Sequence, residues 1–341
     1  MPPAAASEDA KITALGRRRP GPKGGRRYAH EGMHEKWLWL DGTMTRWSEA
    51  TMSVLSHAAQ RGSLVFDVGA LRTAPDGRRL LFRPREHIAR LLRSAALVGL
   101  DPGHDAEALL AATRATARAD AASSALVRWS AFVRSPEPDV VPRAGAPAST
   151  AIAVIGTEDY ARAGEAAPKR PAAVRVAISR DVRKAGPDVL PPQAKVAASY
   201  LGPMLAKRRA LAAGFDEVVL LDGDGHVAEA PTANVFAVVD GALVTPPLGR
   251  VLDSITRDTV IAIARAEGIP AREALMTPEE LAGADEAFLT ATSLPVQPIV
   301  SVDGRAMRAG APGPLTARVQ LAVAACERGE DPRFARWSVA V

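Results

Sequence analysis

Three groups able to act on one cofactor follow each other between Gln193 and Ser293. Lys195 offers an amine among small apolar neighbours, Glu229 offers a carboxylate in a β-rich stretch, and Ser254 opens a stretch with helical periodicity. An amine, a carboxylate and a helix N-terminus are together what a cofactor with an aldehyde and a phosphate tail needs. Each of the three residues also has an ordinary structural explanation.

Lys195 lies between a Pro-containing loop and a helix-like run, KVAASYLGPMLAKRRALAAG, which Gly214 is expected to end. A lysine at the start of a helix is usually a solvated surface residue. The small apolar neighbours Ala194 and Val196 indicate an enclosed position instead, where burial favours the neutral, nucleophilic amine. From the residues alone, both interpretations stay open.

Glu229 is expected on the second strand of a hairpin whose turn lies around Gly223-Asp224-Gly225. Strand alternation places Val227 and Glu229 on one face. Glu229 is then either a solvent-exposed edge residue or a buried carboxylate that needs a cationic partner.

Ser254 directly precedes ITRDTVIAIARAEG and is a natural helix N-cap. The N–H groups around Ile255 and Thr256 would suit a phosphate, although capping alone explains the serine. Thr292-Ser293 follows the apolar strand EAFLTA, and its hydroxyls could either bind an anion or form a turn.

The composition is that of a globular protein long enough for two domains, with 341 residues, 47% hydrophobic and 24% charged. Basic residues outnumber acidic ones by five within residues 1–30, which accounts for the whole net charge of +5. Residues 1–33 are therefore expected to form a disordered basic tail rich in Pro, Gly and Arg. Nucleic-acid contact through this tail is possible, but a solvated leader is favoured.

The single cysteine, Cys326, excludes an intrachain disulfide and fits a reducing compartment, so a cytoplasmic location is expected. No apolar run has the length of a membrane span, and no secretory h-region begins the chain. No metal site is expected.

Strands and helices are predicted in clusters rather than in strict alternation, which favours an α+β fold. Turns at Asp41-Gly42 and Pro75-Asp76-Gly77 predict two hairpins. The expected strands lie within 37–47, 63–73, 78–83, 124–134, 149–156 and 172–178, and the expected helices within 85–100 and 105–119.

Taken together, residues 36–310 resemble the fold-type IV pyridoxal-phosphate aminotransferases, and among them the branched-chain amino-acid aminotransferases. The resemblance rests on a lysine with a tyrosine five residues on, and on EAPTANVF, DGALVTPP, SITRD and DEAFLTATS in that order. It implies a two-domain α+β fold, with a smaller N-terminal α/β domain and a larger C-terminal domain with a pseudo-barrel β core. The implied boundaries are 34–155 for the small domain, 156–171 for the linker, 172–325 for the large cofactor-binding domain and 326–341 for a C-terminal extension.

The resemblance also implies a role for each chemistry-bearing residue. Lys195 would form the Schiff base with pyridoxal 5′-phosphate and move the proton between Cα and C4′. Glu229 would keep the pyridine nitrogen protonated, which makes the ring an electron sink, and Tyr200 would bind the phenolate oxygen. The other implied cofactor residues are Arg90, Ile255, Thr256 and Thr292 at the phosphate and Leu252 at the ring.

The substrate side departs from the family pattern. Arg128 matches the family arginine that receives the distal carboxylate of glutamate, but Leu126 stands where branched-chain enzymes carry a tyrosine. Arg61 replaces another tyrosine and Val68 replaces a glycine, as in (R)-selective amine transaminases, whereas Phe66 and Arg128 return to the branched-chain pattern. The expected substrate pocket comprises Arg61, Phe66, Val68, Leu126, Arg128, Thr292 and Ser293.

We hypothesise that Arg61 supplies the carboxylate binding of the missing tyrosine and that Val68 narrows the pocket. Arg61 could instead pair with Asp67 or another carboxylate at the pocket rim.

The predicted function is amino transfer from an amino acid, a branched-chain L-amino acid or glutamate being favoured, to a 2-oxo acid by a ping-pong mechanism. The resemblance implies a homodimer or higher homo-oligomer in which the partner chain closes the pocket. Alternatives on the same scaffold are an (R)-selective amine transaminase, a D-amino-acid transaminase and a lyase like aminodeoxychorismate lyase. A non-catalytic protein that contacts nucleic acid through its basic tail is the alternative from another class.

Overall fold

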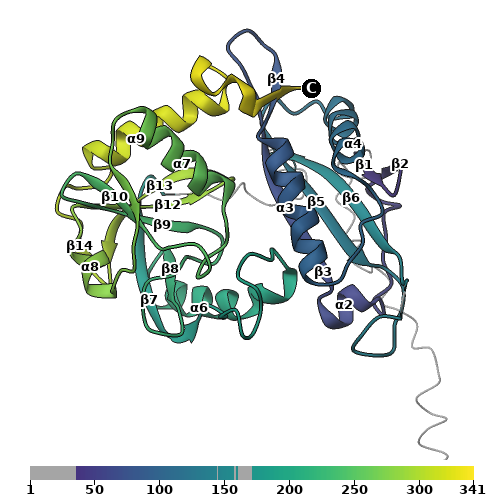
Figure 1. Cartoon of the computed structure of the whole chain (residues 1–341), viewed down its shortest axis with the longest axis horizontal. Helices are drawn as coiled ribbons and strands as arrows, with labels where there is room; N and C mark the ends of the chain where they lie inside the picture. Colours follow the sequence, from purple (N-terminus) through teal and green to yellow (C-terminus); the bar gives the residue numbers. More distant parts are fainter. Residues whose placement is uncertain (1–35, 144, 157–158, 160–170) are drawn as a thin grey trace, which may run out of the picture.

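The computed structural model describes residues 36–341 except 144, 157–158 and 160–170, so the tail 1–33 and most of the linker 156–171 lie outside the described residues. Figure 1 shows two lobes side by side, each built on one β-sheet with helices packed against it. The expected α+β fold is confirmed.

The small lobe is a seven-stranded antiparallel sheet in the order β15-β4-β3-β5-β6-β1-β2. Both predicted hairpins are confirmed, β1 with β2 and β3 with β4. The strands are β1 (Trp37–Leu40), β2 (Thr43–Arg46), β3 (Leu64–Thr73), β4 (Arg79–Phe82), β5 (Ala125–Val133), β6 (Ala148–Gly156) and β15 (Ser338–Ala340). The helices are α2 (His57–Arg61), α3 (Pro84–Leu97) and α4 (Ala106–Ala119).

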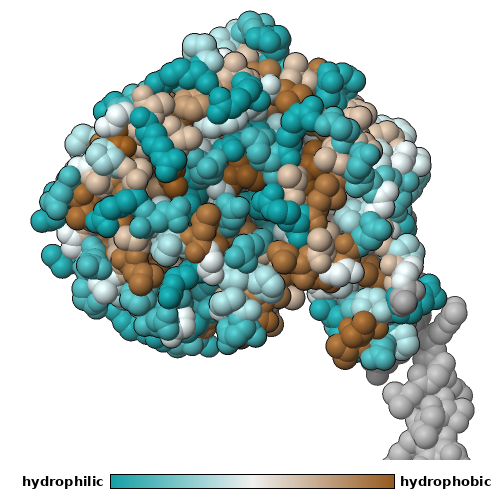
Figure 2. Space-filling view, in the orientation of Figure 1, coloured by the Kyte–Doolittle hydropathy of each residue, from teal (hydrophilic) through white to brown (hydrophobic). Residues whose placement is uncertain are grey.

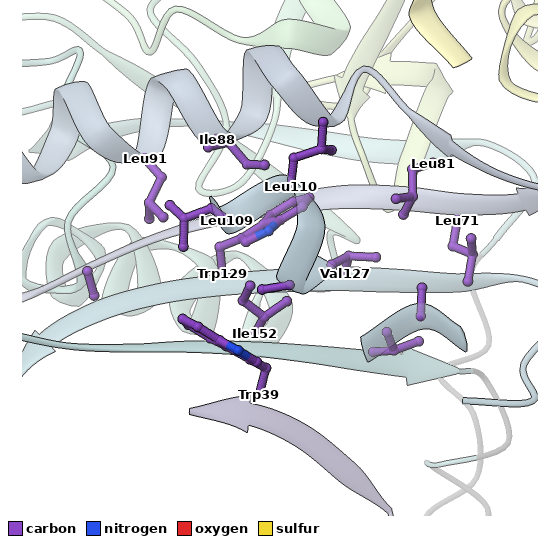
Figure 3. Packing of buried hydrophobic residues seen from close by; sticks show 14 of the residues in the cluster. Trp39, Leu71, Leu81, Ile88, Leu91, Leu109, Leu110, Val127, Trp129 and Ile152 are labelled. Atoms are coloured by element: carbon purple, nitrogen blue, oxygen red, sulfur yellow. The ribbon is translucent and has the colours of Figure 1, made fainter. Parts of the chain in front are cut away.

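The core of the small lobe lies between its sheet and the helices α3 and α4. Ile88 and Leu91, three residues apart on α3, are both fully buried, as the helical spacing predicts. Figure 3 shows them pointing toward Trp129 of β5, whose indole Nε1 donates a 2.8 Å hydrogen bond to the Thr113 hydroxyl. This packing fixes α3 on the sheet, and α3 carries Arg90.

The large lobe is a mixed sheet in the order β11-β10-β9-β12-β13-β7-β8, with β14 paired to β13. Its strands are β7 (Val174–Arg183), β8 (Glu217–Leu221), β9 (Asn234–Val239), β10 (Ala242–Thr245), β11 (Ala271–Glu273), β12 (Glu286–Ala291), β13 (Leu294–Val302) and β14 (Arg305–Ala306). Its helices are the 3-10 turn η1 (Ala197–Tyr200), α6 (Leu201–Ala212), α7 (Ile255–Ala266), α8 (Pro278–Gly283) and α9 (Pro314–Glu327). No helix in the described part of the chain has the length and apolarity needed to cross a membrane.

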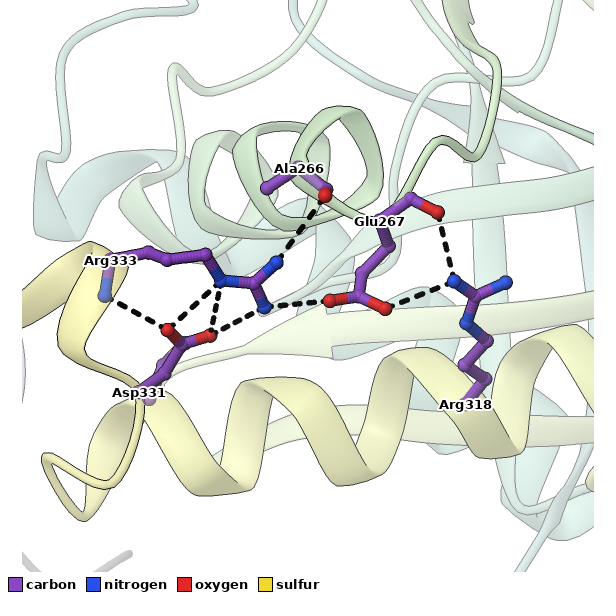
Figure 4. Close-up of polar contacts among 6 residues, drawn as sticks. Ala266, Glu267, Arg318, Asp331 and Arg333 are labelled. Atoms are coloured by element: carbon purple, nitrogen blue, oxygen red, sulfur yellow. Dashed lines mark hydrogen bonds and ion pairs between the residues drawn. The ribbon is translucent and has the colours of Figure 1, made fainter.

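The C-terminal residues link the two lobes. After α9, the 3-10 segment η2 (Pro332–Trp337) leads into β15, which pairs with β4 of the small lobe. Figure 4 shows Arg333 and Arg318 on either side of Glu267, with N–O distances of 2.6 and 2.9 Å, which ties this region to the end of α7.

The expected division of the chain into domains stays a proposal. Two of its details differ from the structure: the expected boundary at residue 325 falls inside α9, and the last strand of the chain belongs to the small lobe's sheet. No sequence pattern indicated the second point, because a three-residue strand is recognised only by the edge with which it pairs.

Candidate active site

A cavity of about 580 Å³ opens between the lobes and is lined by residues of both. In Figure 2 hydrophobic residues gather where the two lobes meet. A concave site between two structural units is the usual setting of a cofactor pocket. The cavity brings together most of the predicted site residues: Phe66, Val68, Arg90, Leu126, Arg128, Lys195, Tyr200, Glu229, Leu252, Thr292 and Ser293.

Lys195, which lies just before η1 of the large lobe, is held in place by two elements of the small lobe, α3 and β3. Its backbone N–H donates to the Ser94 hydroxyl of α3 (3.0 Å), and its carbonyl accepts from the N–H of Phe66 in β3 (3.0 Å). The flanking residues Ala194 and Val196 are buried, and Lys195 itself is half-buried at the cavity, so it is not a fully solvated surface residue. The predicted helix begins later than expected, because the chain is paired with β3 at Val196 and can turn only afterwards.

The turn η1 explains why a tyrosine five residues after the lysine belongs to the same site. It folds the chain back so that the Tyr200 hydroxyl lies 3.0 Å from Lys195 Nζ. Lys195 Nζ also lies 5.1 Å from the centre of the Phe66 ring, and the Phe66 and Tyr200 rings are 5.3 Å apart. Lys195 Nζ is thus enclosed by two aromatic rings and one hydroxyl.

Glu229 is a buried carboxylate with a cationic partner, the second of the two interpretations. Lys184 Nζ lies 2.5 Å from Oε1, and Oε2 accepts hydrogen bonds from the Leu252 N–H (3.0 Å) and the Asn234 amide (3.1 Å). These contacts use both oxygens and hold the carboxylate plane in one orientation, so Glu229 presents a fixed carboxylate, paired with Lys184, to the cavity.

The predicted strand that was to carry Glu229 is not regular. Residues 226–230 lie beside β8, with the Leu220 N–H donating to the Glu229 carbonyl, but they form only isolated bridges. Val227 and Ala228 are both buried, so alternation does not separate a core face from a solvent face here. The reason is that the segment is covered on both sides.

The phosphate end of the site is built from α3 and the start of α7. Arg90 is buried and bonds to Asp67 and to the Asp253 carbonyl just before α7. Ser254 is confirmed as the N-cap, since its hydroxyl accepts from the Arg257 N–H (3.3 Å). Ile255 and Thr256 lie buried in the first turn and are not among the cavity-lining residues.

The substrate side is formed by two neighbouring strands. Val68 of β3 lies directly opposite Arg128 of β5, and Phe66 and Leu126 lie two residues away on the same strands. Because side chains two residues apart share a face of a sheet, all four line the cavity. The Arg128 guanidinium stands 4.5 Å from the centre of the Phe66 ring.

Arg61 is not brought into this cavity. It is the last residue of α2, exposed, and its guanidinium donates to the Gln60 carbonyl (3.1 Å). The alternative that Arg61 pairs with Asp67 is wrong, because the Asp67 carboxylate is taken by Arg90 and His87. A substrate role for Arg61 stays a prediction.

Three residues near the site were not singled out from the sequence, namely His87, Lys184 and Asn234, and Asp67 was considered only as a partner for Arg61. Asn234 alone had a local signal, since it lies in EAPTANVF together with Glu229. The others meet their partners across elements that are distant along the chain, and a sequence pattern does not report that.

Comparison with known proteins decides the family. Residues 65–302 match the family described as amino-transferase class IV. The chain belongs to this family. The aminotransferase is 34% identical to the branched-chain-amino-acid aminotransferase of Escherichia coli K12 over 305 residues, which is 88% of this chain and 96% of that protein.

Two solved structures support the same assignment. The branched-chain aminotransferase of Thermoproteus uzoniensis, solved with norvaline, has a TM-score of 0.81 and 34% identity, and the alignment covers 89% of this chain and 99% of that one. A second branched-chain amino acid aminotransferase, from T.th., was solved with pyridoxamine 5′-phosphate and with N-(5′-phosphopyridoxyl)-L-glutamate. It has a TM-score of 0.82 and 30% identity, and the alignment covers 89% of this chain and 98% of that one.

The enzyme is a pyridoxal-phosphate-dependent transaminase, as the sequence predicts. The donor set in the cavity fits this cofactor: the Lys195 amine for an aldehyde, the Glu229 carboxylate for a ring nitrogen, and Arg90 beside the start of α7 for a phosphate. The non-catalytic alternative is thereby set aside.

Proposed function

We propose that this aminotransferase moves the amino group of a branched-chain L-amino acid or of glutamate to a 2-oxo acid, in two half-reactions on one site. The observation that carries the proposal is that one cavity holds Lys195, Glu229 and Arg90, contributed by both lobes. The similarity to branched-chain aminotransferases supports the choice of donor.

Pyridoxal 5′-phosphate supplies, when bound, an aldehyde that takes up the amino group and a ring that withdraws electrons. Lys195 Nζ would then act as the base that takes the proton from the Cα of the donor and delivers it to C4′, the carbon of the cofactor's aldehyde group. The Tyr200 hydroxyl at 3.0 Å orients this amine. Glu229 would hold a proton on the ring nitrogen, because its carboxylate is fixed by Leu252 and Asn234.

The phosphate would be held by Arg90 with the first turn of α7 and Thr292, and Leu252 would lie against the ring. Thr292, Ser293 and Leu252 line the same cavity as Arg90, which supports these assignments. The helix dipole of α7 adds to the binding of a dianion at this end.

Donor choice would depend on the residues of β3 and β5. Val68 and Leu126 offer apolar surface for a branched side chain, and Arg128 beside Phe66 offers a cation for the distal carboxylate of glutamate. One solved relative was obtained in complex with N-(5′-phosphopyridoxyl)-L-glutamate, which supports glutamate as one of the two donors.

We propose a homodimer or higher homo-oligomer. Val54 and Leu55 are 78% and 63% exposed, and Val140 and Val141 are 71% and 73% exposed. The two loops lie together because His57, next to the first pair, hydrogen-bonds to the Val140 carbonyl (3.0 Å). Figure 2 shows a hydrophobic patch at the lower end of the small lobe, and an exposed apolar patch of this kind is typical of an interface. Light scattering after gel filtration should give at least twice the chain mass, and Val140→Asp should lower it.

We also propose a cytoplasmic location, which the single cysteine supports. Cell fractionation tests this directly, and recovery of the enzyme in a membrane or secreted fraction would contradict it.

The catalytic assignment is tested by chemical trapping. Borohydride reduction of the holoenzyme followed by peptide mapping should find the cofactor on Lys195, and Lys195→Ala should abolish multiple turnover with every donor. A panel of L-leucine, L-glutamate, D-alanine and an (R)-arylalkylamine with two 2-oxo acids then separates the branched-chain function from the alternatives. A reduced adduct on another lysine would overturn the assignment.

A further inference from the structure

A fully buried ionic network lies on the side of β3 that faces away from the cavity. Asp67 stands between Phe66 and Val68, which both line the cavity, so strand alternation points its side chain to the opposite face. There it meets His87 and Arg90 of α3, which are 2% and 4% exposed, while Asp67 itself is 0% exposed. A charge is buried this completely only where it is paired.

The Asp67 carboxylate accepts two hydrogen bonds from the guanidinium of Arg90. Its Oδ2 accepts from Nε (2.7 Å) and its Oδ1 accepts from Nη2 (2.8 Å), while the Asp253 carbonyl accepts from Nη1 (2.9 Å). An arginine carries five N–H groups. Three are used here, which leaves one N–H on Nη1 and one on Nη2 in directions set by Asp67.

His87 holds Asp67 in turn. Its Nδ1 lies 2.7 Å from Asp67 Oδ1, and its ring stacks on Trp129 with centres 5.8 Å apart. Burial lowers the pKa of His87, so the ring is neutral and donates a hydrogen bond without adding charge. Burial alone would raise the pKa of Asp67, but Arg90 and His87 hold it well below its usual range, so Asp67 is ionised.

The pair of Asp67 and Arg90 is therefore electrically neutral as a unit. A phosphate at Arg90 is met by a cation whose charge is already balanced, so the direction of its free N–H groups matters more than net attraction. Removing the charge of Asp67 adds net positive charge beside the phosphate while releasing the guanidinium from its fixed plane. The two effects have opposite signs on phosphate affinity.

We propose that Asp67, held by His87, is a positioning residue that aims Arg90 at the cofactor phosphate. This inference rests on the proposed function in one respect, the assignment of Arg90 to the phosphate. Neither Asp67 nor His87 lines the cavity, so both act through Arg90.

The experiment measures how much the phosphate contributes to binding. The cofactor is stripped from the full-length protein, and dissociation constants are determined for pyridoxal 5′-phosphate and for pyridoxal. The ratio of interest is the affinity for pyridoxal 5′-phosphate divided by the affinity for pyridoxal. In Asp67→Asn this ratio should fall at least about tenfold, with pyridoxal affinity within about twofold of wild type. A role confined to folding would weaken both ligands alike. An unchanged or larger ratio would overturn the inference, because added positive charge alone strengthens phosphate binding.

Two further variants locate any failure. Arg90→Met shows how far the affinity ratio falls when the guanidinium is absent. If this variant leaves the ratio unchanged, the assignment of Arg90 to the phosphate fails and the inference fails with it. If Arg90→Met lowers the ratio but Asp67→Asn does not, only the inference fails. Glu327→Gln is the matched control, because Glu327 forms a buried ion pair with Arg72 (2.9 Å) away from the cavity. It should leave the ratio unchanged.

His87 gives a second test that keeps the charge pair intact, and it decides the question if Asp67→Asn does not fold. His87→Leu should lower the ratio by about threefold, since Asp67 loses one of its donors. A ratio equal to that of wild type would overturn the inference.

Discussion

The ammonium group of Lys184 lies 2.5 Å from the carboxylate of Glu229, in the same cavity as Lys195. Lys184 follows β7, and its backbone N–H donates to the Leu221 carbonyl at the end of β8 (2.8 Å), which fixes it beside the segment that carries Glu229. The carboxylate that faces the cavity is thus partnered by the chain's own residues.

Lys184→Met should destabilise the cofactor-free protein, because Glu229 then keeps only the neutral donors of Leu252 and Asn234. The expected loss in the free energy of unfolding is about 2 kcal/mol, measured by urea denaturation. Lys207→Met is the matched control: its pair with Glu217 has a lysine side chain that is 37% exposed, so the cost should stay below about 1 kcal/mol. Equal losses in the free energy of unfolding would mean that the Lys184–Glu229 pair stabilises the protein no more than the half-exposed Lys207–Glu217 pair.

Glu229→Gln should leave the shape of the site intact while removing its negative charge. If the carboxylate keeps the ring nitrogen protonated, turnover should fall by about a hundredfold or more, while the affinity for pyridoxal 5′-phosphate changes much less. Stopped-flow measurement of one half-reaction gives the rate, and fluorescence titration gives the affinity. A half-reaction rate within about threefold of wild type would contradict the role.

Arg128→Met should separate the two proposed donors. Loss of the cation beside Phe66 should lower kcat/KM for L-glutamate by about a hundredfold, because a distal carboxylate loses its charged partner. L-leucine has no such carboxylate and should change by less than about threefold. Steady-state kinetics with both donors against one 2-oxo acid makes the comparison. Similar decreases in kcat/KM for both donors would contradict a role of Arg128 in binding the distal carboxylate.

The sequence was sufficient where a site depends on spacing along one element. Lys195 and Tyr200 are joined by one turn, Ser254 caps the helix that follows it, and Phe66 with Val68 share a strand face. In each case local geometry converts residue spacing into position.

It was insufficient where a residue is defined by a partner on another element. Lys184 finds Glu229 across two strands, and Asp67 finds Arg90 between β3 and α3, so neither is marked by its own neighbours in sequence. Arg61 is a different case: the substitution pattern suggested a pocket residue, the structure places it at the exposed end of α2, and its substrate role stays a prediction. Strand register and lobe packing decide these positions.

Cys326 should be unreactive in the folded protein. Burial in α9, together with the neighbouring Asp331 carboxylate, raises the pKa of its thiol to about 12. In the unfolded chain the thiol has its ordinary pKa of 9.0, so below about pH 9 it is protonated in both states and its contribution to stability is fully present. Above pH 9 the unfolded chain loses the thiol proton while the folded protein keeps it. The contribution of Cys326 to the free energy of unfolding is therefore lost as the pH rises from 9 toward 12.

Iodoacetamide labelling checks this burial. At pH 8 the reagent should modify Cys326 only after denaturant is added, and Cys326→Ala should show no reaction. Rapid modification without denaturant would contradict the buried position of the thiol.

Arg83, which precedes α3 of the small lobe, contacts α7 of the large lobe and is expected to stabilise the packing of the two lobes. Its guanidinium contacts Asp258 (2.7 Å) and the Thr259 hydroxyl (2.9 Å) in α7 and stacks on Trp337 of the C-terminal segment, with the ring centre 4.6 Å away. Arg83→Met should therefore cost about 2 kcal/mol in unfolding free energy. Because α7 also provides one side of the proposed phosphate site, pyridoxal 5′-phosphate affinity should fall as well.

Arg85→Met is the control for this last prediction. Arg85 lies in the first turn of α3, two residues after Arg83, but both partners of its ion pair with Glu107 are exposed, at 58% and 72%, so the cost should be below about 0.5 kcal/mol. Urea denaturation compares the two variants, and cofactor titration of each follows. If Arg83→Met lowers stability but leaves cofactor affinity at the wild-type value, contacts between the lobes at Arg83 do not position the start of α7, and the phosphate site is fixed by Arg90 alone.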